Sequence, residues 1–263
     1  MVPMPRFSAN LHFLFNERDF LDRFAAAAAA GFRAVEFPDP YAHPLPELAA
    51  RLRANDLACV LLNFPMGDRA KGEMGIACLP DRVIEFRAGV ARAIEAARAL
   101  GCPRLNCMAG RRPPGVDPGA LRATLVQNLT VAAQSCADAG LELCLEPLNS
   151  VDCPDIFIDG TTLATEVMGA VGARNLRLQF DCYHLQIMEG GLEAALQRLL
   201  PMIGHVQIGD VPGRHEPGTG EIDYPRLFAL LDRLGYGGWV GAEYRPSGRT
   251  EDSFGWMRAA SVG

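Results

Sequence analysis

Four oxygen-bearing side chains close successive apolar runs in the second half of the chain. They are Glu146, Asp181, Gln207 and Glu243, separated by 35, 26 and 36 residues. Three carboxylates held close together would repel one another and raise their own pKa values unless a cation lay between them. Because every donor is an oxygen, the set favours a hard divalent ion, Mg²⁺ or Mn²⁺, over zinc. The simpler alternative is that each acid is an ordinary capping or loop residue at a strand end.

The elements that would position these side chains are eight short apolar runs typical of β-strands. They cover residues 6–11, 34–37, 57–63, 104–108, 141–146, 176–181, 203–208 and 238–243. Amphipathic segments typical of helices lie between them, most clearly at 17–31, 85–101, 119–140 and 224–235. This alternation predicts one (β/α)8 barrel domain over residues 1–263, with its chemistry at the carboxyl ends of the strands. Long loops at 64–80 and 109–118 should lie on that same face.

Two histidines accompany these strand ends. His184 follows Asp181 in "DCYHLQ", just past a strand tip, where substrate contact and loop packing are both open. His205 precedes Gln207 by two residues, so the alternation of a strand points both side chains the same way, with His205 one layer deeper. We therefore expect His205 to be a hydrogen-bonded structural residue and His184 to be a candidate substrate contact.

The overall composition excludes several classes of protein. The net charge is −6 and no more than two basic residues stand together, which argues against nucleic acid as a partner. The start of the chain has no secretory pattern, and the longest small-residue run is too short to span a bilayer, so we expect a cytoplasmic protein with no membrane contact. The eight cysteines form no CxxC pair and are expected to be reduced core thiols. A homo-oligomer is compatible with the sequence.

Segments that span nearly the whole chain carry a family resemblance. They read "RFSANL", "GIACLP", "LEPLN", "DCYHLQIMEG", "GHVQI" followed by "GRHEPGTGEIDYPRLF", and "GWVGAEYRP". These segments resemble the hydroxypyruvate isomerase family, which belongs to the xylose-isomerase-like barrel enzymes. The resemblance implies a single divalent metal between two glutamates. It implies that Glu146 and Glu243 are the acid/base pair and that Glu146, Asp181, Gln207 and Glu243 bind the metal.

The reaction that the resemblance implies is the interconversion of hydroxypyruvate and tartronate semialdehyde. This is an intramolecular oxidoreduction of the aldose–ketose type, in which a proton moves between adjacent carbons through an enediolate. A metal would stabilise the developing charge while carboxylates on opposite sides remove and return the proton. The small anionic substrate also needs a cationic cradle, for which Arg214 and His215, in the glycine-rich loop after the seventh strand, are candidates. The alternative is that this loop is a long turn with a surface ion pair.

Two departures from the family pattern leave the exact substrate open. The chain reads "AEYRP" where relatives commonly read "CEYKP", and His12 stands where they carry a small or serine residue. A 2-oxotetronate isomerase of the same family is the nearest alternative, and a ketose 3-epimerase with the same glutamates is another. An abasic-site endonuclease of this superfamily would bind a metal cluster through many histidines, whereas this acidic chain has five. A silent binding barrel could have lost the two glutamates, and both are present.

Overall fold

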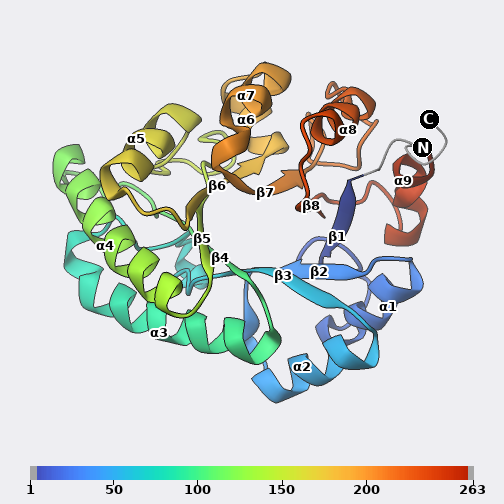
Figure 1. Ribbon diagram of the computed structural model, residues 1–263, viewed down its shortest axis with the longest axis horizontal. Coiled ribbons are helices and arrows are strands. Elements are labelled where there is room, and N and C mark those ends of the chain that lie inside the picture. Colours follow the sequence, from blue (N-terminus) through green and yellow to red (C-terminus); the bar gives the residue numbers. More distant parts are fainter. Residues whose placement is uncertain (1–4, 260–263) are drawn as a thin grey trace.

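A computed structural model describes residues 5–259 of the chain. Eight parallel strands close into a barrel in the order of the sequence, and β8 pairs with β1 (Figure 1). The strands are β1 (Arg6–Asn10), β2 (Ala34–Phe37), β3 (Ala58–Asn63), β4 (Arg104–Cys107), β5 (Glu142–Leu145), β6 (Leu176–Asp181), β7 (Ile203–Ile208) and β8 (Trp239–Ala242). Each lies within one residue of its predicted bounds. The prediction of a (β/α)8 barrel is confirmed.

Helices surround the barrel on its outer side (Figure 1). They are α1 (Arg23–Ala29), α2 (Leu45–Ala54), α3 (Val83–Leu100), α4 (Pro118–Asp138), α5 (Thr161–Val171), α6 (Cys182–Met188), α7 (Leu192–Leu199), α8 (Tyr224–Arg233) and α9 (Gly255–Ala259). Short 3₁₀ turns are η1 (Phe20–Asp22), η2 (Pro40–Ala42), η3 (Arg69–Lys71), η4 (Pro80–Arg82), η5 (Leu200–Met202) and η6 (Thr250–Phe254). None of the helices between residues 5 and 259 is long and apolar enough to cross a membrane.

Local sequence signals explain where the two longest helices begin and end. Asp117 caps α4, because its carboxylate accepts a hydrogen bond from the backbone N–H of Ala120 at 2.9 Å and Pro118 supplies a first-turn residue with no N–H. Helix α3 ends at Gly101, whose φ of 63° is the left-handed conformation that glycine adopts at low cost. Both helices bury an alanine- and leucine-rich face against the barrel.

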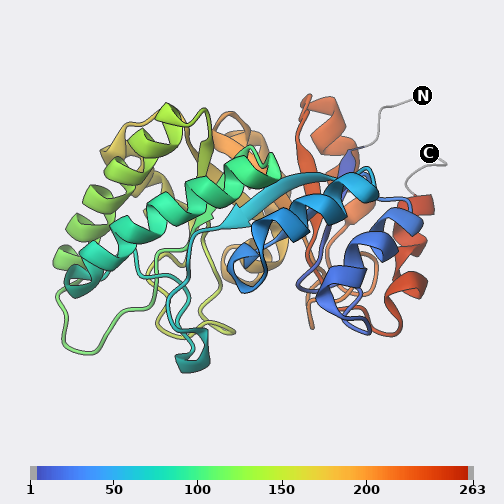
Figure 2. The ribbon, with the colours of Figure 1, turned by 90° about the horizontal axis from the view of Figure 1, so that it is seen from below.

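The loops after the strands share one edge of the barrel. Figure 2 shows the segments after β3 and β4, drawn in teal and green, extending beyond the same edge. Beneath these loops lies a small hydrophobic cluster, separate from the main core, formed by Met108, Leu148, Cys153 and Ile156. All eight cysteines are free and buried, as expected for reduced core thiols.

Candidate active site

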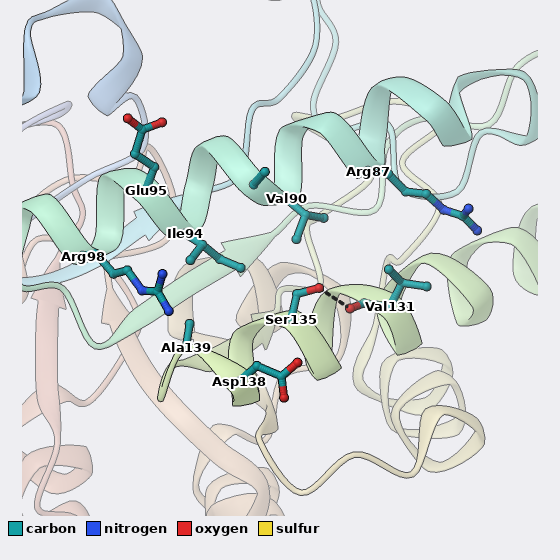
Figure 3. Close-up of a pocket in the computed structure, with 10 residues that line it drawn as sticks. Arg87, Val90, Ile94, Glu95, Arg98, Val131, Ser135, Asp138 and Ala139 are labelled. Carbon is teal, nitrogen blue, oxygen red and sulfur yellow. Dashed lines mark hydrogen bonds between the residues drawn. The ribbon is translucent and has the colours of Figure 1, made fainter.

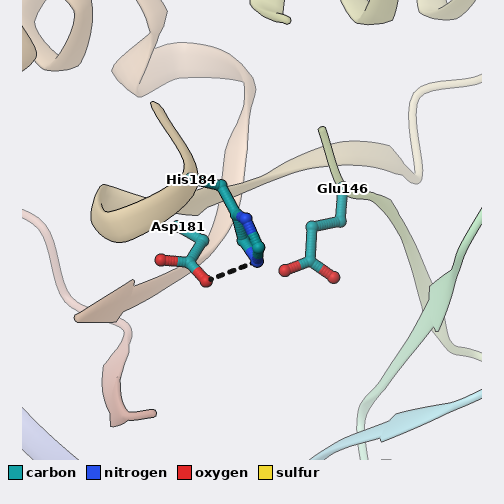
Figure 4. A group of neighbouring side chains, drawn as sticks. All are labelled: Glu146, Asp181 and His184. Atoms are coloured by element: carbon teal, nitrogen blue, oxygen red, sulfur yellow. Dashed lines mark ion pairs between the residues drawn. The ribbon is translucent and has the colours of Figure 1, made fainter. Parts of the chain in front are cut away.

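Three carboxylates meet at the carboxyl ends of the strands. Glu146 directly follows β5, Asp181 ends β6 and Glu243 directly follows β8. Glu146 and Asp181 are buried, and the side chain of Glu243 is 14% exposed. Ligand atoms of Glu146, Asp181 and His184 all lie within 4.8 Å of one another, and Figure 4 shows the imidazole between the two carboxylates. The guanidinium Nη2 of Arg214 lies 3.1 Å from Asp181 Oδ2 and 3.3 Å from Glu243 Oε2.

Burial and mutual repulsion perturb all three acids. Burial, followed by the charge of Asp181, raises the pKa of Glu146 to about 8. Burial also raises the pKa of Asp181, although the positive charge of Arg214 opposes this. Burial also raises the pKa of Glu243 well above its ordinary value, although the positive charge of Arg214 lowers it. One arginine therefore does not offset the cost of holding three carboxylates in their charged forms at this poorly hydrated site.

The donor set suits a divalent cation. Glu243 Oε2 is buried and accepts no hydrogen bond, so it has a free lone pair in a region of high negative charge. Gln207 pairs with Asp181 across β6 and β7, and its amide oxygen accepts one hydrogen bond from Gln179 Nε2 at 2.7 Å. A carbonyl oxygen has a second lone pair, so Gln207 can still serve as a ligand. The residues fit a hard ion bound through oxygen atoms.

His184 is fully enclosed beside the acids. It is 3% exposed, and its Nδ1 lies 3.0 Å from the backbone nitrogen of Asn149. Its Nε2 lies 3.5 Å from Asp181 Oδ2. Burial, with a smaller effect of Arg214, lowers the pKa of His184 well below its ordinary value, so the ring is neutral near pH 7. The ring can therefore take part in hydrogen bonding at the centre without adding positive charge.

The loop after β7 carries Arg214 into the site. Asp210 holds this loop, because its carboxylate accepts hydrogen bonds from the backbone N–H groups of Gly218, Gly220 and Ile222 at 2.8, 2.9 and 3.1 Å. The guanidinium of Arg214 lies over the rings of Phe13 and Tyr183, 4.6 and 4.9 Å from their centroids. These contacts hold Arg214 in place. Among the described residues, Arg214 is the only arginine that pairs with both Asp181 and Glu243.

The two loop residues predicted to bind substrate separate in space. Arg214 is 13% exposed and reaches the acids. The Nδ1 of His215 instead lies 2.8 Å from the backbone carbonyl oxygen of Arg245, and within residues 5–259 His215 forms no hydrogen bond or ion pair with the three carboxylates. Arg214 has a φ of 57°, a left-handed conformation that turns the backbone sharply between the two side chains.

Sequence reasoning missed a layer of polar residues inside the barrel. Glu36 on β2 is fully buried and lies 2.7 Å from His205 Nε2, which confirms His205 as a buried, hydrogen-bonded residue. Asn106 on β4 donates to Glu146 Oε2 at 2.7 Å. Gln179 on β6 donates to Gln207. Each of these residues interrupts an apolar run, in "AVEF", "RLNC" and "LRLQF", and that interruption was the available signal.

A surface groove lies elsewhere on the molecule. It has a volume of about 570 Å³ and lies between α3 and α4, on the outside of the barrel (Figure 3). Its polar lining consists of well-separated side chains, including Arg87, Glu95, Arg98 and Asp138. None of the predicted site residues lines it. The candidate site at the strand ends is therefore separate from this groove.

The protein is a (β/α)8 barrel whose acidic centre, suited to one divalent ion, lies at the carboxyl ends of the strands. This is where the active sites of barrel enzymes lie. The chain belongs to the xylose isomerase-like TIM barrel family, and the family's sequence model matches residues 24–260.

Named relatives agree with this family assignment. The chain is 49% identical over 255 residues to a 2-oxo-tetronate isomerase of Cupriavidus necator, covering 97% of this chain and 98% of the relative. It is 48% identical over 254 residues to the hydroxypyruvate isomerase of Escherichia coli K12, with the same coverage. Among solved structures, an "AP endonuclease, family 2" from Brucella melitensis is 42% identical, with a TM-score of 0.95 over 97% of this chain and 99% of that one.

Proposed function

We propose that this chain is a cytoplasmic isomerase that interconverts hydroxypyruvate and tartronate semialdehyde, with Mg²⁺ or Mn²⁺ at its acidic centre. The observation that carries the proposal is the group of three carboxylates, two of them buried, with one paired arginine. Relatives named hydroxypyruvate isomerase, at 48% identity in Escherichia coli and 44% in Homo sapiens, support it. The eight free cysteines are in keeping with a reducing compartment.

Glu146, Asp181, Gln207 and Glu243 would hold the metal. When bound, the ion would act as a Lewis acid that stabilises negative charge on the substrate oxygens. Asn106 donates a hydrogen bond to one oxygen of Glu146 at 2.7 Å and so fixes the orientation of the carboxylate. That arrangement lets Glu146 take part in proton transfer from a fixed orientation.

The reaction needs one proton to leave carbon 3 of hydroxypyruvate and one to arrive at carbon 2. Glu146 and Glu243 come from β5 and β8, so they approach the centre from different parts of the barrel wall. One, as a carboxylate, would remove the proton from carbon 3, and the other, in its protonated form, would donate its own proton to carbon 2, while a hydroxyl proton moves between the two substrate oxygens. The product has the same atoms as the substrate, so no further reactant is needed.

Arg214 and His184 would recognise the substrate. The guanidinium of Arg214 has donors directed at the centre and is held in place by Phe13 and Tyr183. A charge-assisted hydrogen bond to a carboxylate contributes about 1.5–3 kcal/mol, or about 10–150-fold in affinity. His215 would contribute indirectly, because its hydrogen bond to Arg245 supports the loop that carries Arg214.

A 2-oxotetronate is the second candidate substrate, favoured by the relative from Cupriavidus necator. A pocket of about 170 Å³ lies at the ends of β1 and β2. Its lining includes His12, Asp39, His43 and Arg69, which could contact the additional hydroxyl-bearing carbon.

The test compares substrates with the full-length chain stripped of metal and reloaded with Mn²⁺ or Mg²⁺. Hydroxypyruvate, a 2-oxotetronate, a free ketose and abasic-site DNA are assayed in parallel, with deuterium uptake from D₂O at the exchanging carbon as the readout of isomerisation. We expect metal-dependent exchange and turnover of a 2-oxo acid at least tenfold faster than of the ketose. Preferred turnover of the ketose would replace the proposal with a 3-epimerase, and cleavage of abasic DNA alone would replace it with a nuclease.

Arg214→Ala separates substrate recognition from chemistry in the same assay. We expect KM for the acid substrate to rise by about 10–150-fold, with a smaller change for any neutral ketose, because only the acid carries a carboxylate. An equal loss on both substrates would mean that Arg214 organises the acids and does not bind the substrate carboxylate.

A further inference from the structure

One buried carboxylate forms hydrogen bonds across the interior of the barrel. Glu36 lies on β2 and is 0% exposed, yet it contacts β7, which is not a neighbouring strand. Its Oε2 lies 2.9 Å from Ser8 Oγ and 2.7 Å from His205 Nε2. Its Oε1 lies 3.1 Å from Asn10 Nδ2 and 2.8 Å from Gln207 Nε2. Four groups that can donate therefore surround a group that, when ionised, can only accept.

The barrel wall leaves space for this carboxylate at one position. A Cβ atom built on Gly241 of β8 would lie 2.4 Å from each carboxylate oxygen of Glu36. Any other residue at that position would displace Glu36 or β8. The close approach of a glycine to both oxygens shows that the wall is shaped around the charged end of Glu36.

The contact with Glu36 decides which end of the Gln207 amide points away from Glu36 and toward Gln179. The two ends of the amide are alike in shape but opposite in hydrogen bonding, since the nitrogen donates and the oxygen accepts. An oxygen placed 2.8 Å from Glu36 Oε1 would repel it, so the nitrogen must take this place. The oxygen is then on the opposite side, where it accepts from Gln179 Nε2 at 2.7 Å. An amide nitrogen is not a metal ligand under ordinary conditions, whereas the amide oxygen is.

We propose that Glu36 is a positioning residue that holds Gln207 with its oxygen toward the metal centre, and so completes an all-oxygen donor set. Removing a residue that hydrogen-bonds to a metal ligand typically lowers metal affinity or activity by about 10–100-fold. The inference rests on the metal site of the proposed function, but it does not depend on which substrate that site accepts.

The test measures Mn²⁺ affinity of the full chain by calorimetric titration, independently of turnover. Glu36→Gln keeps the size of the side chain and removes its charge, and we expect the dissociation constant for Mn²⁺ to rise by about 10–100-fold. Ser8→Ala is the matched control, because it removes a donor to the other oxygen of the same carboxylate without touching Gln207. We expect its affinity to stay within about threefold of wild type.

A double-mutant cycle separates positioning from a general effect of charge or folding. In the background of Gln207→Ala, Glu36→Gln should change Mn²⁺ affinity by less than about threefold, because the ligand through which Glu36 acts is already absent. Independent, multiplying losses would overturn the inference and assign Glu36 a purely electrostatic or structural role.

A measurement on the wild-type chain keeps the inference testable if Glu36→Gln does not fold. The side-chain NH₂ of Gln207, assigned by comparison with Gln207→Ala, should show slow hydrogen exchange by NMR with and without Mg²⁺, since it donates to a buried carboxylate. Rapid exchange would overturn the inference. If wild type binds Mn²⁺ and Glu36→Gln binds it equally, this inference alone fails; if wild type binds no divalent ion, the proposed metal site fails as well.

Discussion

His184 Nδ1 accepts a hydrogen bond from the backbone N–H of Asn149 at 3.0 Å. A backbone N–H can only donate, so the neutral imidazole must carry its own hydrogen on Nε2. That nitrogen faces Asp181 and the acidic centre. Although His184 lies close enough to Glu146 and Asp181 to complete a metal-binding group, its tautomer makes it a hydrogen-bond donor there.

The first prediction follows from this tautomer. His184→Ala should lower kcat/KM by about 10–100-fold, the effect of one or two hydrogen bonds lost from a buried site, and leave Mn²⁺ affinity within about threefold. Steady-state kinetics and calorimetric titration on the same preparation measure the two effects. A loss of Mn²⁺ affinity beyond tenfold would instead make His184 a metal ligand.

The second prediction concerns the two glutamates proposed as acid and base. Glu146→Gln and Glu243→Gln should each fold and each reduce kcat by about 10²–10⁴-fold, because an amide preserves size but cannot exchange the proton. Glu142→Gln is the matched control at the opposite end of β5, where Glu142 pairs with Arg104 at 2.7 Å, away from the centre. Turnover of either active-site variant within threefold of wild type would remove that residue from the catalytic pair.

The third prediction is that metal removal destabilises the chain. Without a cation, the buried carboxylates repel one another, and an ion that binds only the folded state stabilises it by about 2.7 kcal/mol at a concentration of 100 times Kd. For a chain of this size, that corresponds to a rise in Tm of roughly 5–10 °C. Melting curves in EDTA and in excess Mg²⁺ measure the difference.

Asp181→Ala provides the control for this effect. It removes one ligand and also relieves part of the repulsion, so its Tm should depend much less on Mg²⁺ than that of wild type. A wild-type Tm that is the same in EDTA and in Mg²⁺ would argue against a metal site of useful affinity.

The fourth prediction concerns His12 at the mouth of the barrel. Loss of hydration at the mouth, followed by the positive charges of Arg69, Arg23 and Arg214, lowers the pKa of His12 to about 4, against an opposing effect of Asp39. The Nη2 of Arg69 lies 3.5 Å from His12 Nε2. His12 should therefore stay neutral down to about pH 5, and NMR titration of its ring should give a midpoint well below 6.5.

The sign of the pH effect on stability follows from the lowered pKa. Below its ordinary value of 6.5, the unfolded chain binds a proton at His12 that the folded chain does not bind until about pH 4. The free energy of unfolding should thus fall as pH drops through this window, and His12→Asn should reduce the fall. Arg69→Ala should raise the NMR midpoint, and a midpoint that does not move would exclude Arg69 as a cause.

The sequence by itself was sufficient to predict the barrel fold and the acidic residues at its strand ends. Alternating apolar runs and amphipathic segments are local patterns, and the carboxyl ends of parallel strands converge in any closed barrel. The residue that ends each run therefore predicts which side chains meet at the mouth of the barrel. Asp181 and Glu243 both pair with Arg214, and Glu146 lies beside Asp181. Their roles as ligands and as acid and base remain predictions.

Only the tertiary structure decided how these residues are oriented. Glu36 and Gln207 are 171 residues apart, and their contact crosses the barrel between strands that are not neighbours. No local pattern encodes which end of an amide will face a carboxylate that far along the chain. Arg214 and His215 are adjacent in sequence, yet one reaches the acids and the other bonds the backbone of Arg245, because side-chain direction depends on the backbone turn at φ 57° and on the partners that packing supplies.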